Sequence, residues 1–90
     1  MHLNADQAVE NENIAFVNTQ SKEANFESLC TGFYMKTTAD VYVAFDRPAQ
    51  SGDFLLSSTD GVVSFEKAKG TRVSAVGVSG SGTLYIMGTR

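Results

Sequence analysis

The last two-thirds of the chain, residues 31–90, is a series of short apolar segments separated by turn signals. The turns recur about every 8 to 12 residues, which is typical of an antiparallel sandwich or small barrel. Units of strand, helix and parallel strand would need helical segments between the strands, and no such periodicity is present. The sequence therefore predicts an all-β fold, a small antiparallel β-sandwich or barrel of six to seven strands. The clearest strands are expected at residues 39–45, 61–66, 71–78 and 83–87.

Residues 26–36 are expected to form one further strand. Their alternation places Leu29, Thr31, Phe33 and Met35 on one face, as in a strand whose side chains point to opposite sides in turn. A helix is the lesser alternative for this segment.

Two turns predict β-hairpins. The dipeptide Asp60-Gly61 is a strong turn signal and is expected to join a short strand at residues 54–56 to a partner at 62–66. The tetrapeptide at residues 79–82, Ser-Gly-Ser-Gly, is expected to join the last two strands in a terminal hairpin.

The chain divides into an N-terminal arm and one domain. Residues 1–13 are polar and acidic, and their few apolar side chains do not form a helical face, so they are expected to be an extended arm. Residues 14–90 are expected to be a single β-sandwich domain. A chain of 90 residues has a thin core. Its stability is therefore expected to depend on partners.

Charge and hydropathy argue against two classes of partner. The net charge is -3, and no run of lysine or arginine is present, so a nucleic-acid backbone is not an expected partner. Lys67, Lys69 and Arg72 lie around an expected turn and are interpreted as a solvated tip. The apolar runs are far shorter than the roughly 20 residues that span a bilayer, and the N-terminus lacks the pattern of a secretory signal.

No arrangement of residues predicts catalysis, a metal site or a cofactor site. The single histidine, His2, lies in the expected arm, and the single cysteine, Cys30, is expected to be a packed thiol. Calcium would need grouped carboxylates, whereas strands and turns separate the candidate acids. These acids are Asp46, Asp53, Asp60 and Glu66.

The glycines near the C-terminus do not form a phosphate-binding loop. Gly77, Gly80 and Gly82 have the spacing G-x-x-G-x-G between two expected strands, whereas phosphate-binding loops open a helix. A turn with a bulge at Gly77 is expected instead.

Two segments, residues 39–46 and 72–86, resemble small structural proteins of tailed bacteriophages. The ending S-G-S-G-T-L-Y-I, residues 79–86, carries most of this resemblance, which covers residues 31–90. The resemblance implies a virion component with a β-sandwich core and contacts between subunits, either a head decoration or cement protein or a minor neck or tail protein. It implies no catalytic, cofactor or metal-binding residues.

The expected function is therefore that of a non-enzymatic virion structural protein, made in the host cytoplasm. We expect it to bind the major capsid protein or other virion proteins through its arm and strand edges. A homo-oligomer is expected, with a trimer favoured because it suits a threefold lattice position. An alternative is a small glycan- or ligand-binding module that uses Tyr34, Tyr42 and Tyr85 together with the loop at residues 47–53.

Overall fold

The computed structural model describes residues 9–65 and 70–89, and within these ranges the chain forms eight β-strands and no helix. The strands are β1 (Val9–Phe16), β2 (Lys22–Cys30), β3 (Gly32–Thr37), β4 (Val41–Phe45), β5 (Phe54–Leu56), β6 (Val63–Phe65), β7 (Gly70–Gly77) and β8 (Gly82–Thr89).

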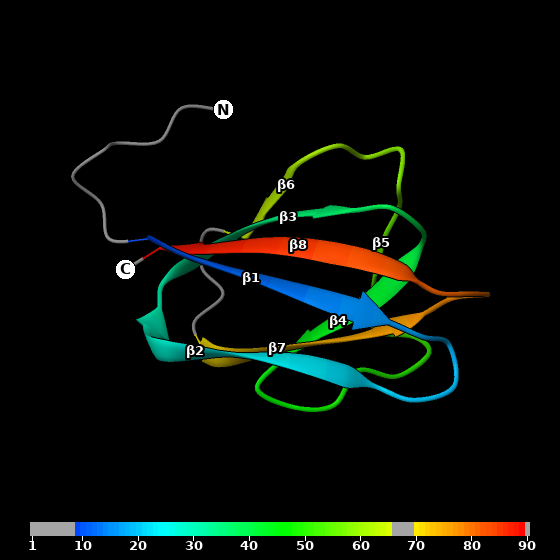
Figure 1. Ribbon diagram of the computed structural model, residues 1–90, viewed down its shortest axis with the longest axis horizontal. Helices are drawn as coiled ribbons and strands as arrows, with labels where there is room; N and C mark the ends of the chain where they lie inside the picture. Colours follow the sequence, from blue (N-terminus) through cyan, green and yellow to red (C-terminus); the bar gives the residue numbers. More distant parts are fainter. Residues whose placement is uncertain (1–8, 66–69, 90) are drawn as a thin grey trace.

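The strands form two antiparallel four-stranded sheets that pack face to face (Figure 1). One sheet has the order β1-β8-β3-β6, and the other has the order β2-β7-β4-β5. Except for the step from β4 to β5, each connection takes the chain from one sheet to the other. This is the strand order of a jelly roll, a double sheet of eight strands. The predicted all-β antiparallel sandwich is confirmed, with eight strands rather than six or seven.

The two predicted hairpins are wrong. The turn at residues 57–60 is present, and Asp60 N donates a hydrogen bond to Ser57 O at 3.1 Å. However, β5 pairs with β4 and β6 pairs with β3, so this turn joins the two sheets. The turn before Gly82 likewise leads from β7, which pairs with β2 and β4, to β8, which pairs with β1 and β3. Turn residues mark where a chain reverses, but they do not determine which strand it then pairs with.

The single strand predicted at residues 26–36 is also wrong, because β2 and β3 lie in different sheets with Thr31 between them. The pairing of β2 with β7 shifts between Asn25 and Cys30. Leu29 is 56% exposed, whereas Phe33 is fully buried, so the two side chains do not share a face. A strict alternation is lost at such a corner because the chain changes sheets there.

The domain begins earlier than predicted. β1 pairs with β8 from Val9 opposite Thr89 to Phe16 opposite Gly82, so residues 9–13 belong to the sandwich and not to an arm. Residues 1–8 of the predicted arm lie outside the described residues. The polar character of β1 misled the prediction because one face of an antiparallel sheet can remain in water.

Phenylalanines from both sheets form a chain of ring contacts that runs from the core to the half-exposed Phe54 on β5. Phe33 lies between Phe26 and Phe45, with ring centroids 5.5 and 5.2 Å apart, and Phe65 joins Phe45 to Phe54 at 5.4 and 5.2 Å. Edge-on and tilted contacts of this kind are worth about 0.5–1.5 kcal/mol each beyond their buried area. These side chains help to hold the two sheets together.

Candidate docking surface

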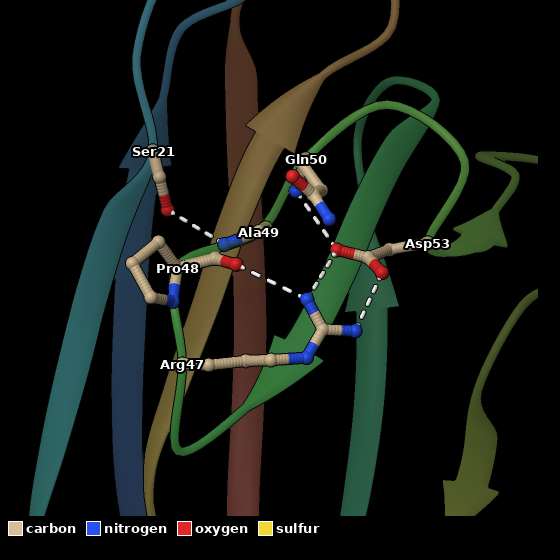
Figure 2. A network of polar contacts seen from close by, with 6 residues as sticks. All are labelled: Ser21, Arg47, Pro48, Ala49, Gln50 and Asp53. Carbon is tan, nitrogen blue, oxygen red and sulfur yellow. Dashed lines mark hydrogen bonds and ion pairs between the residues drawn. The ribbon is translucent and has the colours of Figure 1, made fainter.

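The outer face of the β2-β7-β4-β5 sheet is covered by the chain's own loop. Ala44 and Ser74 are register partners on this outer face, yet they are only 3% and 1% exposed. The loop that follows β4 crosses over this face, where Ala49 is buried and its N donates a hydrogen bond to Ser21 Oγ at 3.0 Å (Figure 2). The loop therefore occupies this face.

An ion pair within the same loop fixes its shape. The Arg47 guanidinium binds both carboxylate oxygens of Asp53, with Nη1 2.9 Å from Oδ2, and Nη1 also donates to Pro48 O at 3.3 Å (Figure 2). Gln50 N donates a further hydrogen bond to Asp53 Oδ2 at 2.8 Å. The hydrogen bond from Arg47, followed by that from Gln50, lowers the pKa of the Asp53 carboxyl below its ordinary value.

A second ion pair lies on this covered sheet, between neighbouring strands. Arg72 on β7 places Nε 3.3 Å from Glu23 Oε2 on β2. Both side chains are partly exposed, so the pair is worth little in stability. Its effect is to place charges of both signs on this side of the molecule.

The outer face of the β1-β8-β3-β6 sheet has a different composition. Its outward side chains follow from the register, in which Asn11, Met87, Tyr34 and Ser64 form one row across the strands. Asn13, Tyr85 and Lys36 form the next row. We name this surface the bare face; it consists of Asn11, Asn13, Ala15, Tyr34, Lys36, Ser64, Thr83, Tyr85 and Met87, together with Val62 beside Lys36.

The bare face is nearly free of charge. Lys36 is the only charged residue among its members, in a chain with ten acidic and seven basic residues. Protein interfaces are depleted of charged residues at their centre and enriched in tyrosine and methionine. Tyr34, Tyr85 and Met87 give the bare face this composition.

A shallow cleft of about 230 Å³ crosses the bare face. Tyr34 and Tyr85 lie on adjacent strands at diagonal positions, and Val62 and Lys36 lie at the β6 side of the cleft. Asn11 and Asn13 lie at its β1 side. Diagonal neighbours on a sheet lie within reach of a single aromatic or long side chain. The cleft can therefore accept an apolar group placed between the two tyrosines.

The edge strands at the two sides of the sandwich differ in how many charged residues they contain. At one side lie β1 and β2, and both contain acidic residues. These two strands are linked by Glu27 N, which donates to the two oxygens of the Glu10 carboxylate at 3.2 and 3.3 Å. Those at the other side, β5 and β6, contain no charged residue, and Phe54, Leu55 and the adjacent Val62 are about half exposed. Charged side chains protect an edge from pairing with another chain, so β5 and β6 are the less protected pair.

Asp46, Asp53 and Asp60, three of the acids that were weighed as calcium ligands, bind other groups of the protein. Asp46 has a φ of 58°, and its Oδ1 accepts hydrogen bonds from Thr71 N and Arg72 N at 3.1 and 3.0 Å. Asp53 binds Arg47, and Asp60 Oδ2 accepts a hydrogen bond from Ser57 N at 2.9 Å. Within residues 9–65 and 70–89, no group of three or more histidine, cysteine, aspartate or glutamate side chains could hold a metal ion. Glu66 lies outside the described residues.

The structure also describes Cys30 and the glycines near the C-terminus, which were considered from the sequence. Cys30 is fully buried, as predicted. A Cβ at Gly77 would collide with the backbone oxygen of Gly80, so the absence of a side chain at Gly77 allows two backbone segments to approach closely where the chain passes from β7 toward β8. His2, Lys67 and Lys69 lie outside the described residues.

Sequence reasoning found part of the bare face. Of the three tyrosines, Tyr34 and Tyr85 share it, whereas Tyr42 lies on the outer face of the other sheet. Asn11, Lys36 and Met87 were not singled out. Residues 10–13 are all polar, so β1 lacks the apolar alternation that could have placed Asn11 on a sheet face.

Comparisons with protein-family models, with curated proteins and with solved structures found no match. In the part of the chain that the structure describes, no helix is long and apolar enough to cross a membrane.

Proposed function

We propose that this protein is a non-enzymatic structural component of a bacteriophage virion, most simply a capsid decoration or cement protein bound to the outer shell. The observation that carries the proposal is the strand order β1-β8-β3-β6 and β2-β7-β4-β5. The jelly roll recurs in viral capsid proteins, although it also occurs in lectins and cupins. Because a fold does not determine a function, the proposal also depends on the surfaces of the molecule.

The strand edges supply the second line of support. β5 and β6 are short, uncharged outer strands, and among the described strands each pairs with one neighbour. The apolar side chains of Phe54 and Leu55 on β5, and of Val62 just before β6, are half exposed. Such edges can accept a strand from another chain. We propose that these edges, together with residues 1–8, contact the capsid protein or a neighbouring copy.

The proposal includes a homo-oligomer. A 90-residue domain buries only about two-thirds of the surface that its unfolded chain exposes, less than a larger domain does. Binding to a partner would add stability by mass action. A trimer would match a threefold position of a shell and multiply weak contacts. The protein would act in the virion and would bind protein rather than nucleic acid.

Copy number tests this proposal and separates its variants. Quantitative mass spectrometry of purified particles from the source of this protein would give its ratio to the major shell protein. Hundreds of copies support a decoration or cement role, and about a dozen or fewer would indicate a neck or tail position. Its absence from particles would refute a virion role.

A second candidate function, a small glycan-binding module, is favoured by the placement of Tyr34 and Tyr85 on one exposed sheet face with Asn11 and Asn13 beside them. Aromatic rings can stack on sugars, and amide side chains can donate and accept hydrogen bonds with their hydroxyl groups. A glycan array tests this candidate, and the absence of binding to any glycan would remove its main support.

A further inference from the structure

The two outer faces of the sandwich suggest different roles. On the covered face, the outer face of the β2-β7-β4-β5 sheet, Ala44 and Ser74 are buried and the crossing loop is bound through Ala49. Two ion pairs lie on that side. The bare face has no such cover among the described residues, and Tyr85 at its centre is 44% exposed. A sheet face that displays two tyrosines, a methionine and a valine to water is a surface suited to a partner.

The chemistry of the bare face restricts what can bind to it. The cleft between Tyr34, Tyr85 and Val62 is lined mainly by apolar atoms and suits an aliphatic or aromatic side chain. Lys36 lies at its rim, beside Tyr85 in the register, and is the one charged residue among those that the structure describes on this face. Covering Lys36 with an uncharged surface would cost free energy, because a desolvated ammonium group needs a partner. A carboxylate placed opposite it would provide that partner.

We infer that the bare face is the surface that docks on the shell protein, and that the shell protein presents an apolar side chain to the cleft and a carboxylate to Lys36. This inference rests on the proposed function, which supplies the partner, and it adds the face that is used and the complementary chemistry of that partner. Nucleic acid does not fit, because the face carries a single positive charge.

The size of the face predicts how it binds. Four strands spaced about 4.8 Å apart and about six residues long cover roughly 400 Å². A stable protein interface buries about 800 Å² on each partner. One copy therefore binds weakly through this face alone, and the strand edges, residues 1–8 or several copies must add to the affinity.

Co-sedimentation of the full-length protein with purified particles that lack it tests the inference. Tyr85→Ser and Lys36→Gln alter the bare face, and each has a matched control on the other sheet, Tyr42→Ser and Arg72→Gln respectively. Thermal unfolding of each variant would verify that it is folded. We expect each bare-face variant to weaken binding about tenfold, and each control to remain within about twofold of the original protein.

The outcomes distinguish this inference from the function on which it rests. If the unaltered protein binds particles and all four variants bind equally well, the bare face is not the docking surface, while the proposed function stands. Tighter binding by Lys36→Gln would overturn the expected carboxylate. If the unaltered protein binds no particle, both ideas fail. Competition by a soluble oligosaccharide would also overturn the inference and favour the glycan-binding module.

Discussion

Gly88 on β8 should tolerate a side chain only if Cys30 becomes smaller. A Cβ at position 88 would lie 2.6 Å from Cys30 Sγ and 3.1 Å from the Phe26 ring. Both of these side chains are buried, so neither can move aside into solvent. Gly88→Ala therefore overpacks the core, at a cost of about 1–3 kcal/mol. In a domain of this size, each 1 kcal/mol lowers Tm by roughly 4–8 °C.

Cys30→Ala should partly restore the stability that Gly88→Ala removes. Cys30→Ala alone leaves a small cavity and should destabilise the fold by about 1–2 kcal/mol. In the double variant, the new methyl group at position 88 fills the space left by Sγ. The double variant should therefore be about 1–2 kcal/mol more stable than the sum of the two single effects predicts. The remaining approach to Phe26 prevents a complete rescue.

Urea unfolding, followed by circular dichroism, would measure these free energies on the original protein and the three variants. Cys30→Ala with Gly82→Ala provides the control, because Gly82 lies at the opposite end of β8 from Gly88 and a Cβ there would meet Phe16 and Thr38. That pair should be additive within about 0.5 kcal/mol. If Gly88→Ala and Cys30→Ala were equally additive, the packing of Gly88 against Cys30 would be refuted.

Three further predictions concern a backbone contact, a loop and the N-terminus. Gly77→Ala should destabilise the fold far more than Gly80→Ala, because a Cβ at Gly77 would collide with the backbone oxygen of Gly80, whereas nothing lies within 4 Å of a Cβ at Gly80. Urea midpoints of the two variants would test this, and equal midpoints would contradict it. Arg47→Gln should raise the pKa of the Asp53 carboxyl, as followed by NMR titration, because the hydrogen bond from Arg47 is the main cause of its lowered value. The pKa of Asp53 in the folded protein lies below the unfolded value of about 3.9, so the ionised carboxylate contributes stability at pH values above about 3.9, and this contribution is lost as the pH falls through the folded pKa. If the pKa of Asp53 did not change in Arg47→Gln, the role of Arg47 would be contradicted. Deleting residues 1–8 should weaken binding to particles while the Tm is retained, because all eight described strands remain. Unchanged particle binding would contradict the role proposed for this segment.

The sequence identified where most strands lie, but not how they pair. Alternation predicted β4 and β7 nearly to the residue, because a half-buried strand repeats its apolar side chains with a period of two. Pairing depends on contacts between distant segments, and in a jelly roll nearly all consecutive strands lie in different sheets. A turn such as Asp60-Gly61 has the same composition whether it joins neighbours in one sheet or crosses between sheets. Both predicted hairpins failed for this reason.

The N-terminal boundary of the domain was predicted wrongly for a related reason. β1 contains two glutamates and two asparagines, so its composition suggested an arm. Ile14 and Phe16 are nevertheless buried against the other sheet, and β8 supplies partners for the backbone along all of β1. Strand formation at β1 therefore depends on a partner about seventy residues later in the chain, as Glu12 pairs with Ile86. No local pattern in the first thirteen residues could have shown this.

The same topology explains why the candidate docking surface is a property of the folded chain and not of any segment. Lys36 and Tyr85 become neighbours only because β3 pairs with β8, and Asn13 joins them only because β1 pairs with the other side of β8. The loop after β4 crosses the other sheet, where Ala49 reaches Ser21, so it covers that face and leaves the bare face open. A substitution outside the cleft that weakens the pairing of β1 with β8 should therefore reduce particle binding, although it changes none of the side chains that line the cleft. If substitutions in the cleft weakened particle binding while substitutions that weaken the β1–β8 pairing did not, the bare face would not depend on that pairing for binding.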